Sequence, residues 1–122
     1  GEFGEAWHCD YATSKAGLRG LLMSLKNEIV HLAAHGRVNL VNPGWAVTPM
    51  AEAALSDHAR VSKILQTIPL RKVATPSDIA HAILYLSSDK LAGHVSGQTI
   101  TVAGGMEGRV LFSKEDVKAD TK

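Results

Sequence analysis

The chain has 122 residues, and its 13 Lys and Arg residues against 12 Asp and Glu residues give a formal net charge of only +1. This balance excludes the strongly basic surface that nucleic acids or anionic membranes select, so we expect neither as a partner. A hydrophobic share of 45% with 20% charged residues suits one globular domain with a buried core. No apolar run reaches the ~18 residues of a transmembrane helix. The single cysteine, Cys9, excludes an internal disulfide and favours a reducing compartment, hence a cytoplasmic location.

The first predicted element is an amphipathic helix from Asp10 to about Ala34, because apolar residues recur every three or four positions. Asp10 is expected to cap its start, and Gly36 to end it in a left-handed conformation. Gly17 and Gly20 each cost a helix about 1 kcal/mol relative to Ala, which suggests that another backbone approaches that face closely. The apolar stripe consists of Leu18, Leu21, Leu22, Leu25, Ile29 and Leu32.

The middle of the chain predicts a strand followed by a helix. Residues 38–41 are rich in β-formers and are stopped by Pro43 and Gly44, which is typical of a buried strand that ends in a loop. Residues 51–68 carry apolar side chains at helical spacing and predict a second amphipathic helix before Pro69.

The last part of the chain predicts one more helix and one more strand. Thr75 and Asp78 form a capping box with Pro at the first helical position, so a third helix is expected to begin there. Residues 89–97 are interpreted as a loop, and residues 98–105 as a second strand closed by two glycines. The tail, 106–122, becomes polar and is expected to fray.

A helix that connects two strands favours a parallel pair in an α/β protein. Parallel sheets are covered on both faces and are rarely two strands wide, so two strands and three helices would leave apolar surface exposed. We therefore expect residues 1–122 to form a single partial domain with an extended tail at 106–122.

Tyr11 and Lys15 are the first candidates for chemistry, because a spacing of four places both on one face of the helix. A free phenol, with a pKa of about 10, is a poor base at neutral pH, and a nearby ammonium favours the phenolate. The spacing alone is common, and taken by itself it favours an ordinary surface pair.

Three motifs in order change that interpretation. The segments "YATSKAGLRGLLMSLKNEI", "GRVNLVNPGWAVTPM" and "SGQTITVAGGM" together resemble the C-terminal half of the short-chain dehydrogenase/reductase (SDR) family over residues 4–106. The resemblance implies the C-terminal part of a Rossmann-like, doubly wound parallel sheet in three α/β/α layers. It also implies an NAD(P)-dependent oxidoreductase that transfers hydride between nicotinamide and a small alcohol or carbonyl substrate.

The resemblance also implies roles for the Tyr/Lys pair. Tyr11 corresponds to the general acid/base that exchanges a proton with the substrate oxygen. Lys15 corresponds to its electrostatic partner, which also binds the nicotinamide ribose, and both residues are expected to contact the cofactor.

Further roles follow for the middle motif. Pro43 and Gly44 correspond to the turn beside the nicotinamide, Val47 to the backbone contact with the carboxamide, and Thr48 to a hydroxyl contact with the cofactor. Trp45 and Met50 are the substrate-binding candidates within residues 45–72, although helix packing explains Met50 equally well.

Parts of the family's site have no counterpart in this sequence. The Gly-rich turn that binds the dinucleotide phosphates is absent, and the family's catalytic serine would precede Gly1. We therefore expect NAD or NADP to bind tightly only to a complete protein, and this chain alone to be inactive. The sequence leaves the substrate, the reaction direction and the choice of NAD or NADP open.

A second hypothesis remains open, in which the chain is a non-catalytic binding or oligomerising module. The resemblance implies homo-oligomer contacts through the helix at 10–34 and the segment 75–105. His31 and His35 are spaced to chelate a metal on one helix, but no third ligand is evident, so no metal site is predicted.

Overall fold

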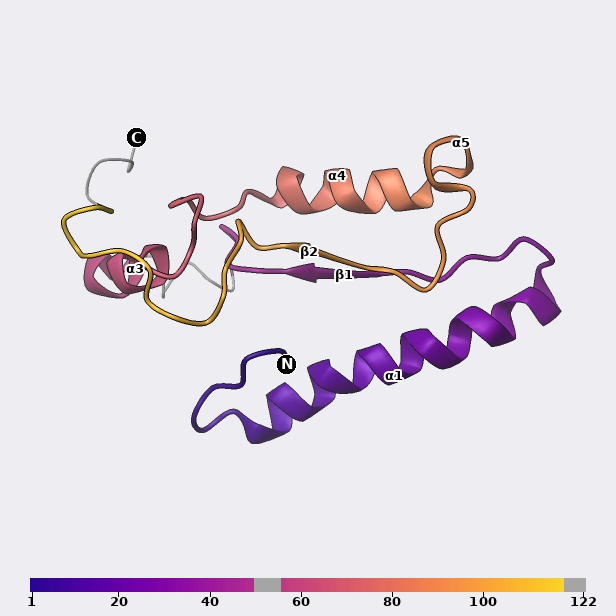
Figure 1. Ribbon diagram of the computed structural model, residues 1–122, viewed down its shortest axis with the longest axis horizontal. Helices are drawn as coiled ribbons and strands as arrows, with labels where there is room; N and C mark the ends of the chain where they lie inside the picture. Colours follow the sequence, from indigo (N-terminus) through magenta and orange to yellow (C-terminus); the bar gives the residue numbers. More distant parts are fainter. Residues whose placement is uncertain (50–55, 118–122) are drawn as a thin grey trace. The chain divides into compact units, whose positions relative to one another are not determined.

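A computed structural model describes residues 1–49 and 56–117 of the chain (Figure 1). The order along these residues is one helix, one strand, three helices and one strand, whereas the sequence predicts two helices between the strands. The elements are α1 (Cys9–Leu32), β1 (Leu40–Pro43), α3 (His58–Leu65), α4 (Pro76–Ser87), α5 (Asp89–Ala92) and β2 (Thr99–Val102).

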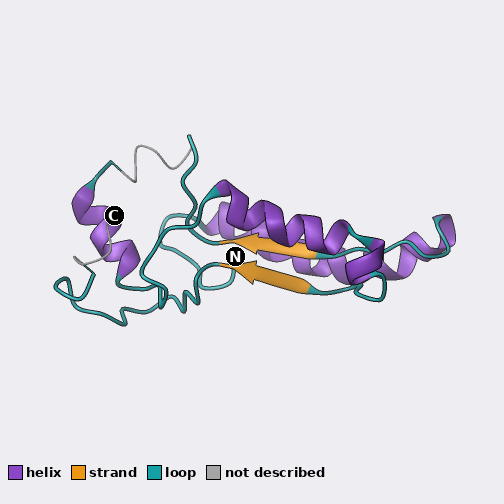
Figure 2. Cartoon of the chain, turned by 90° about the horizontal axis from the view of Figure 1, so that it is seen from above, coloured by secondary structure: helices purple, strands orange, loops and turns teal. Residues whose placement is uncertain are grey.

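The two strands form one sheet and run in the same direction (Figure 2). The Leu40 N–H donates to the Gln98 carbonyl at 2.9 Å, and the Gly44 N–H donates to the Val102 carbonyl at 2.9 Å. This register keeps both ends of the short ladder paired. The predicted α/β class with a parallel strand pair is therefore confirmed.

The chain divides into two compact units, residues 1–41 with 83–100 and residues 42–82 with 101–122. Both strands and α4 contribute residues to each unit. In the first unit, α1 and the C-terminal part of α4 lie on opposite sides of the strands (Figure 1). Buried apolar residues are Leu22, Leu86 and Ala92 in the first unit, and Ile64, Leu65, Ile68 and Val117 in the second.

Helix α1 covers nearly the whole of the predicted range, 10–34, but the residues that cap its start and its end differ from the prediction. His8, rather than Asp10, occupies the N-cap without a side-chain cap bond, and Asp10 lies in the first turn, where its charge suits the helix dipole. The helix ends at Ala33 in an extended conformation. Gly36 is not among the glycines with positive φ, so the predicted left-handed end is wrong.

The apolar stripe of α1 is only partly covered. Leu22 is buried, whereas Leu21 and Leu32 are exposed. A β-carbon on Gly17 or Gly20 would meet nothing within 4 Å, so within residues 1–49 and 56–117 no backbone outside α1 itself approaches them closely. Exposed apolar surface was expected from two strands and three helices, and α1 carries part of it.

Helices α3 and α4 are fixed at their starts by side-chain caps. The Asp57 carboxylate accepts hydrogen bonds from the N–H groups of Ala59 and Arg60 at 2.9 and 3.2 Å. The predicted capping box of α4 is confirmed, since Thr75 N–H donates to Asp78 at 2.7 Å and Asp78 N–H donates to the Thr75 hydroxyl at 3.3 Å. The bond from the Thr75 backbone, followed by that from its hydroxyl, lowers the pKa of Asp78.

The segment predicted as a loop at 89–97 contains the short helix α5. Ser88 caps it, and its hydroxyl accepts a bond from the Leu91 N–H at 3.3 Å. Four residues are too short a run for hydrophobic periodicity to be recognised, which explains why the sequence pattern misses this helix.

Candidate active site

Tyr11 and Lys15 lie on the first two turns of α1, and their side chains converge. The Lys15 Nζ atom lies over the Tyr11 ring, 5.3 Å from its centroid. Tyr11 is 58% exposed and Lys15 is exposed as well. The geometry is that of a cation–π pair open to a ligand. The structure therefore brings the two side chains together as the spacing predicts.

The neighbouring hydroxyl groups are used within the helix. The Thr13 hydroxyl donates to the Cys9 carbonyl at 2.7 Å, and the Ser14 hydroxyl donates to the Tyr11 carbonyl at 2.8 Å. Such bonds to the preceding turn hold short polar side chains against the helix. In α1 as the structure describes it, the Tyr11 and Lys15 side chains make no such bond to the helix backbone, and both are exposed.

Pro43 and Gly44 form the turn at the end of β1, in the second unit. A β-carbon on Gly44 would lie 2.7 Å from the β-carbon of Ala103 and 2.8 Å from its α-carbon. Only a glycine fits this approach to the backbone that follows β2. The close packing fixes the direction in which the chain leaves the strand.

The loop after this turn is held by an isolated parallel bridge between Ala46 and Ala74. The Ala74 N–H donates to the Trp45 carbonyl, and the Val47 N–H donates to the Ala74 carbonyl, both at 2.9 Å. The N–H of Val47 is therefore already used within the fold. Because peptide groups alternate in direction along an extended chain, those of Ala46 point away from Ala74.

Trp45 is half-buried, and the guanidinium of Arg60 on α3 lies over its ring, 5.9 Å from the centroid. Arg60 was not singled out by the sequence, because a cation–π partner fifteen positions away leaves no periodic signal. Thr48 is half-buried in the same loop. Met50 lies outside the described residues.

Tyr11 and Lys15 belong to the first unit, whereas Pro43, Gly44, Trp45, Val47 and Thr48 belong to the second. Each group is internally ordered by the contacts described above. The first offers a phenol and an ammonium, and the second offers backbone groups, a hydroxyl and an aromatic ring.

The histidine pair does not share a helix. His31 lies in the last turn of α1, but the helix ends at Leu32 and His35 follows in the connecting segment. The predicted spacing on one helix is therefore wrong, because the chain becomes extended at Ala33. Across residues 1–49 and 56–117, no three His, Cys, Asp or Glu side chains gather as a metal site.

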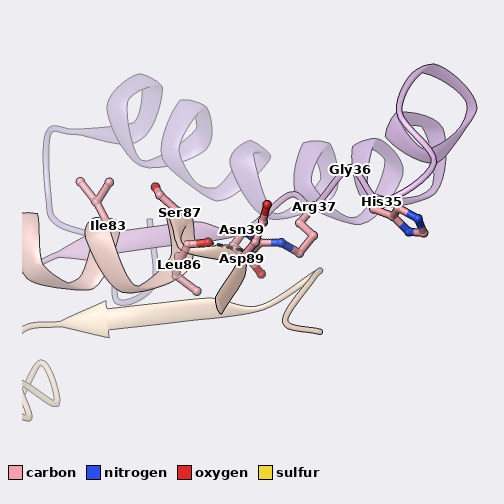
Figure 3. Close-up of a pocket in the computed structure, with 8 residues that line it drawn as sticks. All are labelled: His35, Gly36, Arg37, Asn39, Ile83, Leu86, Ser87 and Asp89. Carbon is pink, nitrogen blue, oxygen red and sulfur yellow. Dashed lines mark hydrogen bonds and ion pairs between the residues drawn. The ribbon is translucent and has the colours of Figure 1, made fainter. Parts of the chain in front are cut away.

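A hollow of about 510 Å³ lies in the first unit and contains none of the predicted site residues (Figure 3). Its central side chain, Arg37, donates to the Leu86 carbonyl and pairs with the Asp89 carboxylate, both at 2.7 Å. The Arg37 guanidinium is therefore engaged within the fold. The lining residues are His35, Gly36, Arg37, Asn39, Ile83, Leu86, Ser87 and Asp89.

We interpret this hollow as a structural junction. Its Arg37 side chain joins the segment before β1 to the end of α4 and the start of α5, through Leu86 and Asp89. None of the helices in the described part of the chain is both long and apolar enough to cross a membrane.

Comparison with known proteins places this chain among reductases and dehydrogenases of one family. A family profile described as enoyl-(acyl carrier protein) reductase matches residues 3–107. A 3-oxoacyl-[acyl-carrier-protein] reductase of Rickettsia conorii is 41% identical over 104 residues, which is 84% of this chain and 41% of the relative. The chain thus spans about two fifths of the length of the curated relatives it matches.

Solved structures give the same result. A short-chain dehydrogenase/reductase of Brucella melitensis matches with a TM-score of 0.74 and 34% identity over 85% of this chain and 40% of that one. A 4-hydroxyisoleucine dehydrogenase complexed with NADH matches with a TM-score of 0.72 and 33% identity, covering 78% and 38%. A 2-deoxy-D-gluconate 3-dehydrogenase candidate of Agrobacterium tumefaciens with bound NADP matches with a TM-score of 0.70 and 40% identity, covering 78% and 37%.

Proposed function

This chain belongs to the short-chain dehydrogenase/reductase family, and from that membership we propose that the whole protein is an NAD(P)-dependent oxidoreductase. Its substrate would be a small alcohol or carbonyl compound. The observation that carries the proposal is the Lys15 ammonium over the Tyr11 ring on an exposed helix face.

The residues present fit a nicotinamide cofactor and its substrate. The exposed phenol and ammonium can be reached by one ligand at the same time. When bound, the nicotinamide would supply or accept a hydride at the substrate carbon. In reduction, the Tyr11 hydroxyl donates its proton to the carbonyl oxygen and its O–H bond breaks as the new O–H bond forms. In oxidation the same oxygen accepts that proton.

Lys15 has two proposed roles. It makes the loss of the Tyr11 proton easier, and it binds the cofactor ribose. Its positive charge stabilises negative charge on the phenol oxygen when the proton has left. Its three N–H donors can also bind ribose hydroxyls. Both roles require the ammonium at the helix face where it lies.

In the second unit, Pro43 and Gly44 would shape the wall beside the nicotinamide, and Thr48 would contact the cofactor through its hydroxyl. The N–H of Val47 is bonded to Ala74, so we assign the backbone contact to the carboxamide to the Val47 carbonyl and the peptide groups of Ala46. Trp45 and Met50 would contact the substrate.

Oligomer formation is a second part of the proposal. Gly17 and Gly20 lie on α1 with open space beside them, and Leu21 is exposed nearby. Small residues beside apolar ones permit close helix packing, so α1 would pair with its counterpart in another subunit. The segment 75–105 would form a second interface. A non-catalytic oligomerising module shares these features and is the competing proposal.

The chain alone is proposed to bind dinucleotide weakly and to lack turnover, since its sequence holds no Gly-rich phosphate turn. The single exposed cysteine fits a reducing, cytoplasmic setting. Calorimetric titration of the chain with NADH and NADPH tests the first point, and binding at micromolar concentration would contradict it.

The catalytic proposal is tested in the full-length protein with Tyr11→Phe. We expect the turnover to fall by about 10²–10⁴-fold, because the general acid/base is lost, while cofactor affinity stays near the wild-type value. Tyr85→Phe is the matched control, because Tyr85 is the other tyrosine of the chain and lies on α4. Near-normal turnover in Tyr11→Phe would contradict the role of Tyr11 as the general acid/base.

A further inference from the structure

Arg71 has a backbone conformation that side chains rarely adopt. Its φ is +51°, in the left-handed region where a β-carbon crowds the neighbouring carbonyl. The Arg71 N–H donates to the Ile68 carbonyl at 2.8 Å and closes a tight turn. Glycine would form this turn without strain. An arginine here therefore indicates that its side chain makes contacts that offset the strain.

Those contacts are with the C-terminal strap, which we define as residues 111–117. The Arg71 guanidinium lies over the Phe112 ring, 5.6 Å from its centroid, and its Nη1 donates to the Asp116 carbonyl at 3.3 Å. Val117, at the end of the strap, is only 3% exposed. This part of the predicted tail is thus packed within the second unit, of which it is a part.

Gln66 provides a second attachment for the strap. Its carbonyl accepts the N–H groups of Leu111 and Phe112 at 2.7 and 3.2 Å, and its side-chain amide donates to the Phe112 carbonyl at 3.0 Å. Gln66 is 8% exposed and is the buried polar residue of the described chain. The strap therefore contacts both ends of the turn at 66–71.

The strap also has its own internal order. The Asp116 carboxylate accepts the Ser113 N–H at 2.9 Å and the Ser113 hydroxyl at 2.7 Å. The bond from the hydroxyl, followed by that from the backbone, lowers the pKa of Asp116. This local turn presents the Asp116 carbonyl to Arg71.

The turn at 66–71 is also connected to the loop that follows β1. Ala74, three positions beyond Arg71, forms both hydrogen bonds that hold Trp45 and Val47. The Leu70 N–H donates to the Gly104 carbonyl at 3.1 Å, which fixes the turn to the end of β2. The strap, the turn at 66–74 and the loop at 45–48 thus form one continuous set of contacts within the second unit.

We propose that Arg71 is a positioning residue, which fastens the C-terminal strap to the turn at 66–71 and thereby holds the loop at 45–48 in place. Its kinetic consequence rests on the proposed oxidoreductase function, in which this loop contacts cofactor and substrate. The attachment itself does not depend on that function.

The test uses the full-length protein and its Arg71→Gly variant. Glycine removes the guanidinium and relieves the backbone strain, so the turn can form without the tether. Hydrogen exchange in the 111–117 peptide should accelerate by about tenfold or more, because the strap opens more often. The KM for substrate should rise about threefold or more, with kcat changed by less than about twofold.

Two further variants complete the experiment. Arg109→Ala is the matched control, because Arg109 pairs with Glu107 at 2.7 Å beside the strap. It should leave exchange and KM unchanged. Phe112→Ala removes the ring from the Arg71 contact and should reproduce the Arg71→Gly effects. It keeps the test decisive if Arg71→Gly fails to fold.

The outcomes distinguish the attachment of the strap by Arg71 from the positioning of the loop at 45–48. Unchanged exchange at 111–117 in both Arg71→Gly and Phe112→Ala overturns the attachment. Faster exchange with an unchanged KM overturns the positioning role. If the wild-type protein turns over no alcohol or carbonyl substrate, the proposed function fails, and exchange at 111–117 and at 45–48 still decides whether Arg71 holds the strap and loop.

Discussion

A β-carbon placed on Gly44 would lie 2.8 Å from the α-carbon of Ala103, so the turn after β1 tolerates no side chain. Gly44→Ala must push two backbones apart, and we expect a loss of about 1–3 kcal/mol in the free energy of unfolding. Chemical denaturation measures it. Gly20→Ala is the control, since a β-carbon there meets nothing within 4 Å and alanine favours a helix. Equal stability of the two variants would contradict the close packing.

The open face of α1 gives a prediction that separates helix stability from self-association. Gly17→Ala should stabilise the helix itself by about 1 kcal/mol, because alanine is the better helix former. In the oligomer it should instead obstruct close packing between helices. Analytical ultracentrifugation of the full-length protein should therefore show weaker association. Unchanged association would argue that α1 does not form the interface.

Arg37 and Asp89 form an ion pair whose two members should differ sharply in their importance. The Arg37 side chain is 12% exposed and also bonds two carbonyls, whereas the Asp89 side chain is 93% exposed. Arg37→Met removes the donor to the Leu86 carbonyl, while the Val95 carbonyl keeps its bond from the Asn39 amide, and should cost about 1–3 kcal/mol of folding free energy. Asp89→Asn removes a solvent-screened charge and should cost less than about 1 kcal/mol. Urea titrations of both variants measure the difference, and similar losses would contradict this account.

The capping boxes predict a pH dependence. Folding lowers the pKa of Asp78, so its charged form is favoured in the folded chain. The stabilisation is complete above the ordinary carboxyl pKa of about 3.9 and is lost as the pH falls through the lower folded-state value. Asp78→Asn should remove this part of the acid transition. Unfolding monitored by circular dichroism from neutral pH downward tests it, with Glu115→Gln as the control. An unchanged pH profile in Asp78→Asn would count against the cap.

Local sequence signals predict local structure well in this chain. The Thr75–Asp78 box has its predicted hydrogen bonds, because capping depends on residues three positions apart. The strand predicted at 38–41 is found at Leu40–Pro43, so Pro43 lies inside it and only Gly44 follows its end. Asp10 was a reasonable cap by residue type, but the helix begins one residue before it, and preference for a capping residue is weaker than the packing that sets a helix end.

Contacts between distant segments could not be predicted in this way. The residue types of Ala46 and Ala74 do not predict a bridge between them, because both of its hydrogen bonds are made by backbone groups. Arg71 resembles an ordinary surface arginine until its φ and its contact with Phe112 are known. The Tyr11–Lys15 pair was found because both residues lie on one helix, where spacing alone determines proximity.

If the loop at 45–48 contacts the cofactor as proposed, the bridge between Ala46 and Ala74 makes residue 74, which contacts no ligand itself, a determinant of cofactor affinity. One residue carries the donor and the acceptor for the loop, so a proline at position 74 would delete the donor without touching any ligand. Selection for altered nicotinamide binding can therefore act through residue 74. Under the proposed function, a substitution could then change the affinity for the cofactor without altering any residue that contacts it.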